Sequence, residues 1–265
     1  MADLLAEVPP ATPTSPTAPI LPIVLPIARA PRRRRSRRLL AAAAIAAGAW
    51  LAWEAITWPD VAALAHANPK TTAFIDEYRG RGWLGPRKPV EWRWVSYGRI
   101  AASFKHAVLI GEDDEFFSHH GFARDEMEDA LREAWQEKRL PRGASTITQQ
   151  LAKNLWLSRW RNPLRKVKEA LLTRQLERDL PKRRILELYL NVVELGPGVY
   201  GAEAGARRYF GKSAASLSLH EAAALAASLP YPETWHPGSR SRNYLWRVRL
   251  IERRMGRSMW LRSEL

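Results

Sequence analysis

A run of apolar residues near the N-terminus restricts this chain more than any other feature. Leu39 to Trp53 contains no charged residue, and only Glu54 interrupts an apolar segment that continues to Trp58. A helix needs about 20 residues to cross the hydrocarbon core of a bilayer, and residues 39–58 are just long enough. The sequence therefore predicts a single transmembrane helix at the N-terminus.

The residues on either side of this segment predict how it lies in the membrane. Seven arginines and no acidic residue lie between Arg29 and Arg38, and three tryptophans lie between positions 50 and 58. Basic residues before a span favour a cytoplasmic N-terminus, and tryptophans favour the membrane interface. A cleaved signal peptide is the alternative, but the tryptophans and Glu54 do not suit a cleavage site, which needs small residues. We expect an uncleaved anchor.

The charge of the chain indicates an anionic partner. The net charge is +15, and the first 38 residues hold only seven of the 42 basic residues, so the rest of the chain is basic as well. Such a surface suits nucleic acid, anionic lipid or a phosphorylated substrate. An arginine cluster can also serve as a nucleic-acid arm, but the apolar span after it places the basic domain on the wrong side of the membrane. We expect no nucleic-acid partner.

There are no cysteines, which excludes disulfides and cysteine metal sites.

The chain divides into four expected regions. These are a disordered, Pro- and Ala-rich cytoplasmic tail with its basic cluster (1–38), the transmembrane helix (39–58), a juxtamembrane connector with some helix near Val61–Ala67 (59–89) and the main folded domain (90–265). Further helices are expected at 125–139, 146–157, 163–179, 182–191, 218–228 and 244–255. An apolar helical face that includes Phe104 leads to Glu112, and Ser218 with Glu221 forms a capping box. No strand signal stands out, so the fold class is mainly α.

The segment from Gly143 to Asn154 combines a helix start with side chains that suit an anion. Thr146 and Gln149 have the spacing of a capping box, so a helix should begin here, and its first N–H groups suit a phosphate. Ser145, Gln149 and Lys153 follow one another at i, i+4 spacing and should share one helix face. An ordinary capped amphipathic helix is the alternative for this segment alone.

Five segments resemble, in order and spacing, the motifs of the peptidoglycan glycosyltransferases, glycosyltransferase family 51. They are Glu112–Gly121, Gly143–Asn154, Arg165–Glu169, Lys182–Asn191 and Gly198–Gly211. Among its members, the chain resembles the monofunctional biosynthetic transglycosylases, and we expect no transpeptidase domain between these motifs and Leu265. The resemblance implies a lysozyme-like α fold with a small membrane-facing jaw sub-domain. One departure is Ala123, where many members carry Asp.

The resemblance also implies an activity and a location. The enzyme would polymerise lipid II into β-1,4-linked glycan strands, release undecaprenyl diphosphate and invert the anomeric carbon. Its partners would be lipid II, the nascent glycan and inner-membrane lipid, with wall-synthesis or division proteins as further candidates. It would span the bacterial inner membrane once, with a cytoplasmic N-terminus and a periplasmic catalytic domain. A divalent cation, Mg²⁺ or Mn²⁺, at the pyrophosphate is left open.

Two glutamates carry the expected chemistry. The apolar stretch Ala107–Gly111 before Glu112 would desolvate its carboxylate and raise its pKa, and the resemblance implies that Glu112 is the general base on the acceptor 4-hydroxyl. A solvated acidic patch over 112–115 is the alternative. The resemblance places Glu169 near the pyrophosphate, whereas a plain i, i+4 ion pair with Arg165 is the alternative.

The remaining site residues are assigned by the resemblance. Substrate-binding roles are implied for Ser145, Gln149, Lys153, Arg161, Arg165 and Lys166, and supporting roles for Asp113, His119, Thr146, Gln150, Asn154, Glu187 and Asn191. Counted from Phe116, the motif histidine is His119 rather than His120, and we expect it to be structural. The last two motifs look mainly architectural, with Gly198 and Gly201 in tight turns and Tyr209 and Phe210 in the core.

Two other functions are open to such a chain. A lysozyme-like fold can also cut glycans with a glutamate acid, which would make the protein a wall hydrolase. A non-catalytic membrane scaffold for wall synthesis is the second alternative. The expected phosphate-binding residues argue against a hydrolase, which has no pyrophosphate to hold, and the two glutamates argue against a scaffold.

Overall fold

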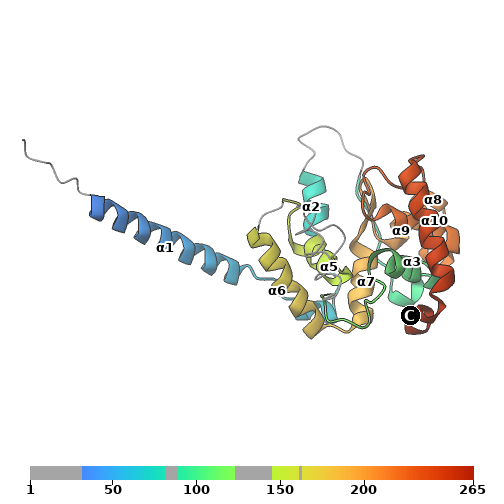
Figure 1. Ribbon diagram of the computed structural model, residues 1–265, viewed down its shortest axis with the longest axis horizontal. Coiled ribbons are helices and arrows are strands. Elements are labelled where there is room, and N and C mark those ends of the chain that lie inside the picture. Colours follow the sequence, from blue (N-terminus) through green and yellow to red (C-terminus); the bar gives the residue numbers. More distant parts are fainter. Residues whose placement is uncertain (1–31, 81–88, 123–144, 161–162) are drawn as a thin grey trace, which may run out of the picture. The chain divides into compact units, whose positions relative to one another are not determined.

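The computed structural model describes residues 32–80, 89–122, 145–160 and 163–265, which are mostly helical (Figure 1). The chain forms two compact units, Met1–Trp58 and Pro59–Leu265. Residues 1–31 of the expected N-terminal tail, the helix predicted at 125–139, Ala123 and Arg161 lie outside the described residues. The last part of that tail, 32–38, was expected to be disordered but is helical, because arginines favour a helix and the helix of the apolar segment extends back through them. Within the described residues, the prediction of a mainly α fold is confirmed.

The first unit contains helix α1 (Arg32–Ile56). Its segment Arg37–Ile56 is long and apolar enough to cross a membrane, and none of that segment is buried within the structure. It is the one helix among the described residues with this length and composition. Apolar side chains such as Leu39 and Ile45 are more than two-thirds exposed, at 71% and 73%. Because such a surface needs an apolar environment, α1 has the properties of the predicted membrane anchor.

The second unit is built from eight described helices and four short 3₁₀ helices. The α-helices are α2 (Ala73–Gly80), α3 (Ala102–Glu112), α5 (Ile147–Trp156), α6 (Pro163–Asp179), α7 (Lys182–Val192), α8 (Ala202–Phe210), α9 (Leu219–Ser228) and α10 (Arg242–Arg257). The 3₁₀ helices are η1 (Ala62–Ala65), η3 (Tyr97–Arg99), η4 (Ala214–Ser216) and η5 (Met259–Glu264). Each predicted helix that falls on described residues is confirmed, whereas α2 and α8 were not predicted.

The helices pack in two groups that meet where α3 ends. Helices α3, α9 and α10 contact one another, and α5 packs on both α6 and α7 (Figure 1). Helix α9 is buried from Ala222 to Ser228, and its small alanine side chains let α3 and α10 approach closely. Ser218 caps α9 in a full capping box with Glu221, as predicted. The last residue of α3, Glu112, thus lies beside both groups.

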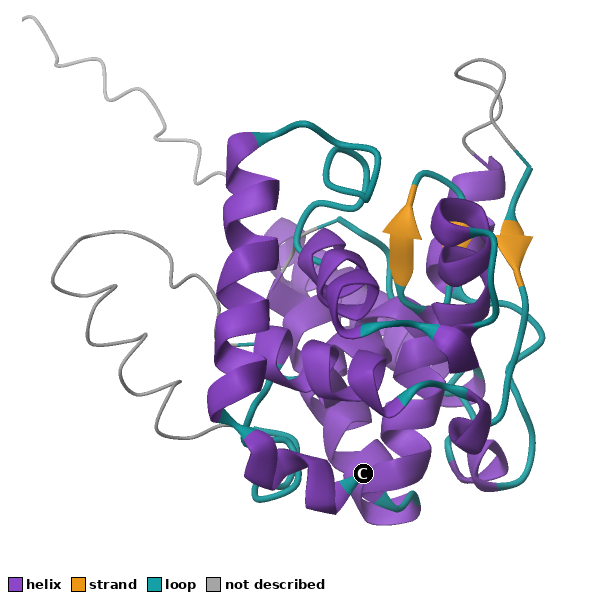
Figure 2. Ribbon diagram, turned by 90° about the vertical axis from the view of Figure 1, so that its right-hand side faces the viewer, coloured by secondary structure: helices purple, strands orange, loops and turns teal. Residues whose placement is uncertain are grey.

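A small sheet covers part of the second unit and was not predicted (Figure 2). Strands β1 (Glu91–Trp92), β2 (Glu194–Gly196) and β3 (Val199–Tyr200) lie in the order β1-β3-β2, with β1 parallel and β2 antiparallel to β3. Strands of two or three residues cannot show a period-two pattern, so the sequence gives no sign of them. Gly201 follows β3 at φ +82°, and a Cβ there would lie 2.4 Å from the carbonyl oxygen of Asn191. The predicted glycine turn is therefore confirmed at Gly201.

Two segments differ in their packing from what the sequence suggests. The region expected as a connector includes α2, whose Phe74 and Tyr78 form an apolar cluster with Tyr200. This region therefore contributes to the core of the second unit. Tyr209 and Phe210 were expected in the core, but both are only partly buried. Tyr209 instead stacks on the ring of His236, which shields one face of each ring.

Candidate active site

The carboxylate of Glu112 lies at the junction of the two helix groups. Helix α3 is buried from Ser103 to Ile110, and the Glu112 side chain that follows is 11% exposed. Its Oε1 accepts a hydrogen bond from Arg247 on α10 at 2.8 Å, and its Oε2 accepts one from Gln150 on α5 at 2.9 Å. Burial raises the pKa of Glu112, against the opposing effects of Gln150, Arg247 and Lys153. The expected direction of the shift is therefore confirmed.

Arg247 is the member of the site that sequence reasoning missed. Its Nη2 also donates to the carbonyl of Gly111 at 2.9 Å, so one guanidinium fixes α10 to both the backbone and the side chain at the end of α3. No partner for its buried Nε is present among the described residues. The sequence indicated only a basic helix here, because nothing local distinguishes Arg247 from the other arginines of α10.

The start of α5 differs from the predicted anion site. The capping box is confirmed, with the Thr146 N–H donating to Gln149 Oε1 at 3.0 Å. Ser145 lies before the helix and is exposed, so the predicted face shared by Ser145, Gln149 and Lys153 does not form. Gln150, one residue further, reaches Glu112 instead. The side chain of Gln149 is engaged in its own cap.

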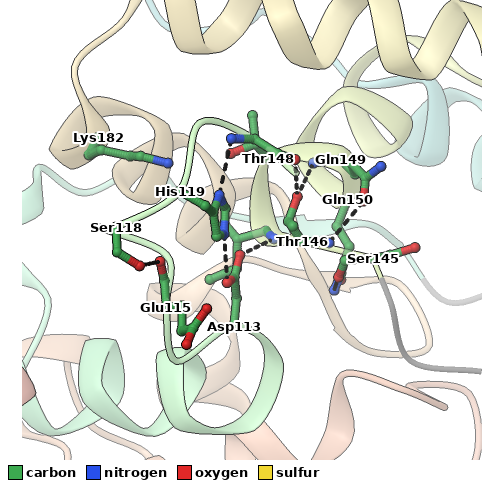
Figure 3. A network of polar contacts seen from close by, with 12 residues as sticks. Asp113, Glu115, Ser118, His119, Ser145, Thr146, Thr148, Gln149, Gln150 and Lys182 are labelled. Atoms are coloured by element: carbon green, nitrogen blue, oxygen red, sulfur yellow. Dashed lines mark hydrogen bonds and ion pairs between the residues drawn. The ribbon is translucent and has the colours of Figure 1, made fainter. Parts of the chain in front are cut away.

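Asp113 occupies the helix start that was expected to suit a phosphate. Its Oδ2 accepts the N–H of Ile147 at 2.8 Å, and its Oδ1 binds His119 Nε2 at 2.8 Å (Figure 3). His119 Nδ1 accepts the N–H of Gly121 at 3.0 Å, and the Thr146 hydroxyl donates to the Gly121 carbonyl at 2.7 Å. Since Nδ1 accepts, Nε2 carries the proton that binds Asp113. Both ring nitrogens of His119 therefore bind groups of the protein, while the exposed His120 is outside this network.

Replacing Asp113 by asparagine is expected to lower the thermal midpoint of unfolding by roughly 5–10 °C, a loss of about 2–3 kcal/mol. An amide at this position must turn its NH₂ group toward either Ile147 N–H or His119 Nε2–H, which leaves a buried donor without an acceptor. Differential scanning calorimetry measures the change. The matched control is Asp114→Asn, whose side chain is 38% exposed and paired with Arg254, because such a pair contributes about 0–1 kcal/mol. Equal midpoints for the two variants would contradict the assigned role of Asp113.

Glu169 lies at the centre of a group of cations. Its side chain is only 4% exposed, and its two oxygens bind Arg165 Nη1 at 3.1 Å and Lys166 Nζ. The i, i+4 ion pair considered from the sequence is therefore present. Burial lowers the pKa of Lys153 on α5, while Glu169 and, more weakly, Glu112 raise it. Lys153 thus interacts with both glutamates and links them electrostatically.

The described residues form no metal site from protein side chains alone. Nowhere in 32–80, 89–122, 145–160 and 163–265 do three His, Cys, Asp or Glu side chains gather as metal ligands. Both oxygens of Glu169 already bind cationic side chains, which would repel a divalent ion.

The remaining predicted residues lie around the site rather than in it. Asn154 is buried on α5, and Glu187 pairs with Arg184 at 3.2 Å. The Asn191 side chain holds the backbone of Val95, accepting its N–H and donating to its carbonyl, both at 2.9 Å. These contacts attach α7 to the segment after β1, so they support the scaffold.

Comparison with known proteins gives consistent matches. A family model described as Transglycosylase matches residues 83–256. The biosynthetic peptidoglycan transglycosylases of Laribacter hongkongensis and Thiobacillus denitrificans are each 46% identical to this chain, over 71% of its length and 83% and 82% of theirs. That of Paraburkholderia xenovorans is 40% identical over 78% of this chain and 87% of its own. The residues matched by the family model include Glu112, Gln150, Lys153, Glu169 and Arg247.

Proposed function

The chain belongs to the transglycosylase family, and on that premise we propose how this peptidoglycan transglycosylase, a glycosyltransferase of cell wall synthesis, carries out its reaction. Its substrate is lipid II, which it polymerises into β-1,4-linked glycan with inversion at the anomeric carbon. The observation that carries the proposal is the buried carboxylate of Glu112, held by Gln150 and Arg247 beside a cationic cluster.

Glu112 acts as the general base. The 4-hydroxyl oxygen of the acceptor sugar forms a bond to C1 of the donor, the bond from C1 to the diphosphate oxygen breaks, and the hydroxyl proton passes to the carboxylate. Burial makes that carboxylate more basic than an exposed one, since it raises the pKa. Arg247 and Lys153 keep enough of it ionised to accept the proton. No covalent intermediate is needed.

The cations around Glu169 stabilise the departing diphosphate. Lys153, Arg165 and Lys166 place three positive charges around one carboxylate, so the cluster retains an excess of positive charge for an anion. Charge-assisted hydrogen bonds to phosphate are about twice as strong as neutral ones, and they strengthen as negative charge develops on the leaving group. Glu169 positions these cations, and Ser145, Gln149 and Arg161 remain proposed substrate contacts from the resemblance.

The outer face of α6 receives the lipid. Leu164, Val167 and Leu171 lie at i, i+3 and i+7 on this helix and are each more than half exposed, and Trp160 just before it is 82% exposed. These side chains share one helix face, while Glu169 of the same helix is buried. An apolar face with a tryptophan at its border suits the membrane interface, where the lipid chain of the donor lies.

The anchor places this domain outside the cytoplasm. The arginines between Arg29 and Arg38 favour a cytoplasmic N-terminus, so the residues after α1 lie in the periplasm. A phosphatase that folds only in the periplasm, fused after Leu265, should be active in cells. Activity confined to a cytoplasmic reporter at the same position would reverse the topology.

Polymerisation of labelled lipid II by the purified full chain tests the proposed function. Long glycan strands should form in detergent, and preformed glycan should keep its length. Shortening of preformed glycan would instead favour the hydrolase. If no product forms, with or without added divalent ions, the scaffold function would be favoured.

A further inference from the structure

We propose that Tyr189 is a positioning residue for the general base. Its hydroxyl fixes the side-chain amide of Gln150 so that the amide N–H, and not the carbonyl oxygen, faces Glu112. The inference rests on the proposed role of Glu112 as the base. It assigns a function in the reaction to α7, a helix whose motif otherwise looks architectural.

The geometry is a chain of hydrogen bonds across three helices. The Tyr189 hydroxyl on α7 donates to Gln150 Oε1 at 2.9 Å, and Gln150 Nε2 on α5 donates to Glu112 Oε2 at 2.9 Å. The same Nε2 lies 3.3 Å from the carbonyl oxygen of Ser145. The Tyr189 side chain is fully buried, which shields its hydroxyl from water.

Only one orientation of the Gln150 amide satisfies this network. Burial and the nearby carboxylates of Glu112 and Asp113 raise the pKa of Tyr189 well above its ordinary value, so its hydroxyl keeps its proton and donates. If the amide were turned over, its oxygen would face both Glu112 Oε2 and the Ser145 carbonyl, and both contacts would join two acceptors. Its NH₂ could donate to the tyrosine oxygen, but the buried Tyr189 O–H would then lose the acceptor that Gln150 Oε1 provides.

The orientation of Gln150 matters because it opposes the effect of burial on the base. Burial raises the pKa of Glu112, and the hydrogen bond from Gln150 is the largest single effect that lowers it, while the charge and the hydrogen bond of Arg247 and the charge of Lys153 act in the same direction. A hydrogen bond to the ionised form favours that form. Without Tyr189 to hold it, the Gln150 N–H faces Glu112 for less of the time, and the pKa of Glu112 rises further.

The sign of the effect on catalysis follows from the need for an ionised base. The rate rises with pH as Glu112 loses its proton, so a higher pKa moves this rise to higher pH. The charged groups that face Glu112 are Arg247 from α10 and Lys153 from α5, with Asp113 next in the chain. None of these groups is altered by removal of the Tyr189 hydroxyl. A shift of the acid limb therefore reports on the contact between Gln150 and Glu112.

The test is the pH dependence of kcat/KM for lipid II polymerisation by the full chain and by Tyr189→Phe. We expect the acid limb of the variant to lie roughly 0.5–1 pH unit higher than that of the parent. The decrease in kcat/KM should be smaller at the alkaline plateau than on the acid limb. The matched control is Tyr244→Phe, which removes another buried hydroxyl. That hydroxyl donates to the Ala224 carbonyl at 3.0 Å and makes no contact with the base. The acid limb of the Tyr244→Phe profile should lie at the same pH as that of the parent. An unchanged limb in Tyr189→Phe, or an equal shift in Tyr244→Phe, would overturn the inference.

A double-mutant cycle shows whether Tyr189 acts through Gln150. Gln150→Leu should shift the limb further than Tyr189→Phe does, and adding Tyr189→Phe to it should produce no further shift. An added shift would contradict the proposed route. If Gln150→Leu is inactive, the carboxyl infrared band, after subtraction of the Glu112→Gln spectrum, gives the pKa of Glu112 without turnover. Wild-type activity in Glu112→Gln would overturn the assignment of Glu112 as the base. If Glu112→Gln is inactive but the acid limb of Tyr189→Phe does not shift, only the role of Tyr189 is overturned.

Discussion

Replacing Glu112 by glutamine is expected to lower lipid II polymerisation by about 10²- to 10⁴-fold. Glutamine has the same shape as glutamate and can still accept a hydrogen bond from Arg247, but its amide cannot take a proton from the acceptor hydroxyl. Some stability should also be lost, because the amide NH₂ group must face the donor of either Gln150 or Arg247, and that donor then lacks an acceptor. Single-turnover glycan formation and the thermal midpoint, measured side by side, separate the two effects.

The control for this variant is Glu115→Gln, which removes an exposed carboxylate from the same acidic run. Its activity should stay within about two-fold of the parent, as expected for a surface substitution away from the site. Should Glu112→Gln retain more than about a tenth of the activity, the carboxylate would not be the base. The acid limb of the wild-type pH profile should also be absent from any residual activity of Glu112→Gln.

The elements that could be predicted are those specified by local signals. The capping boxes at Thr146 and Ser218 fixed two helix starts within a residue, and α6 has the predicted bounds, Pro163–Asp179. Each of these signals involves residues three or four positions apart. The strands and α2 escaped prediction because the strands are too short for a pattern and α2 is a helix of eight residues in a region that also holds Pro69, Pro86 and Pro89.

The site itself could be predicted only in part, because its contacts join distant parts of the chain. Glu112 and Arg247 are 135 residues apart, and Gln150 and Tyr189 are 39 apart. The prediction also favoured Gln149 over Gln150, since it counted helical spacing from Ser145. Ser145 precedes the first helical residue, so that spacing does not define a face. Adjacent helix positions point about 100° apart, and only the second glutamine reaches the base.

The second large effect is expected for Lys153→Met, which should lower kcat by about 10²- to 10³-fold, the usual cost of removing one preorganised group that stabilises transition-state charge. Methionine keeps the length and flexibility of the chain but removes the ammonium that interacts with both Glu112 and Glu169. The fold should tolerate the change, because burial already opposes the charged form of Lys153. Lys70→Met, at an exposed lysine, is the matched control for the loss of one positive charge and should leave kcat unchanged.

The pH dependence of Lys153→Met distinguishes two ways in which this lysine could act. Its charge lowers the pKa of Glu112, so its loss should move the acid limb to higher pH as well as lower the plateau. If Lys153 also stabilises the leaving diphosphate, the plateau remains low at every pH, because no change in the ionisation of Glu112 replaces that cation. Full recovery of kcat at high pH would mean that Lys153 serves only to keep the base ionised. Stabilisation of the diphosphate would then fall to Arg165 and Lys166, the cations that bind Glu169.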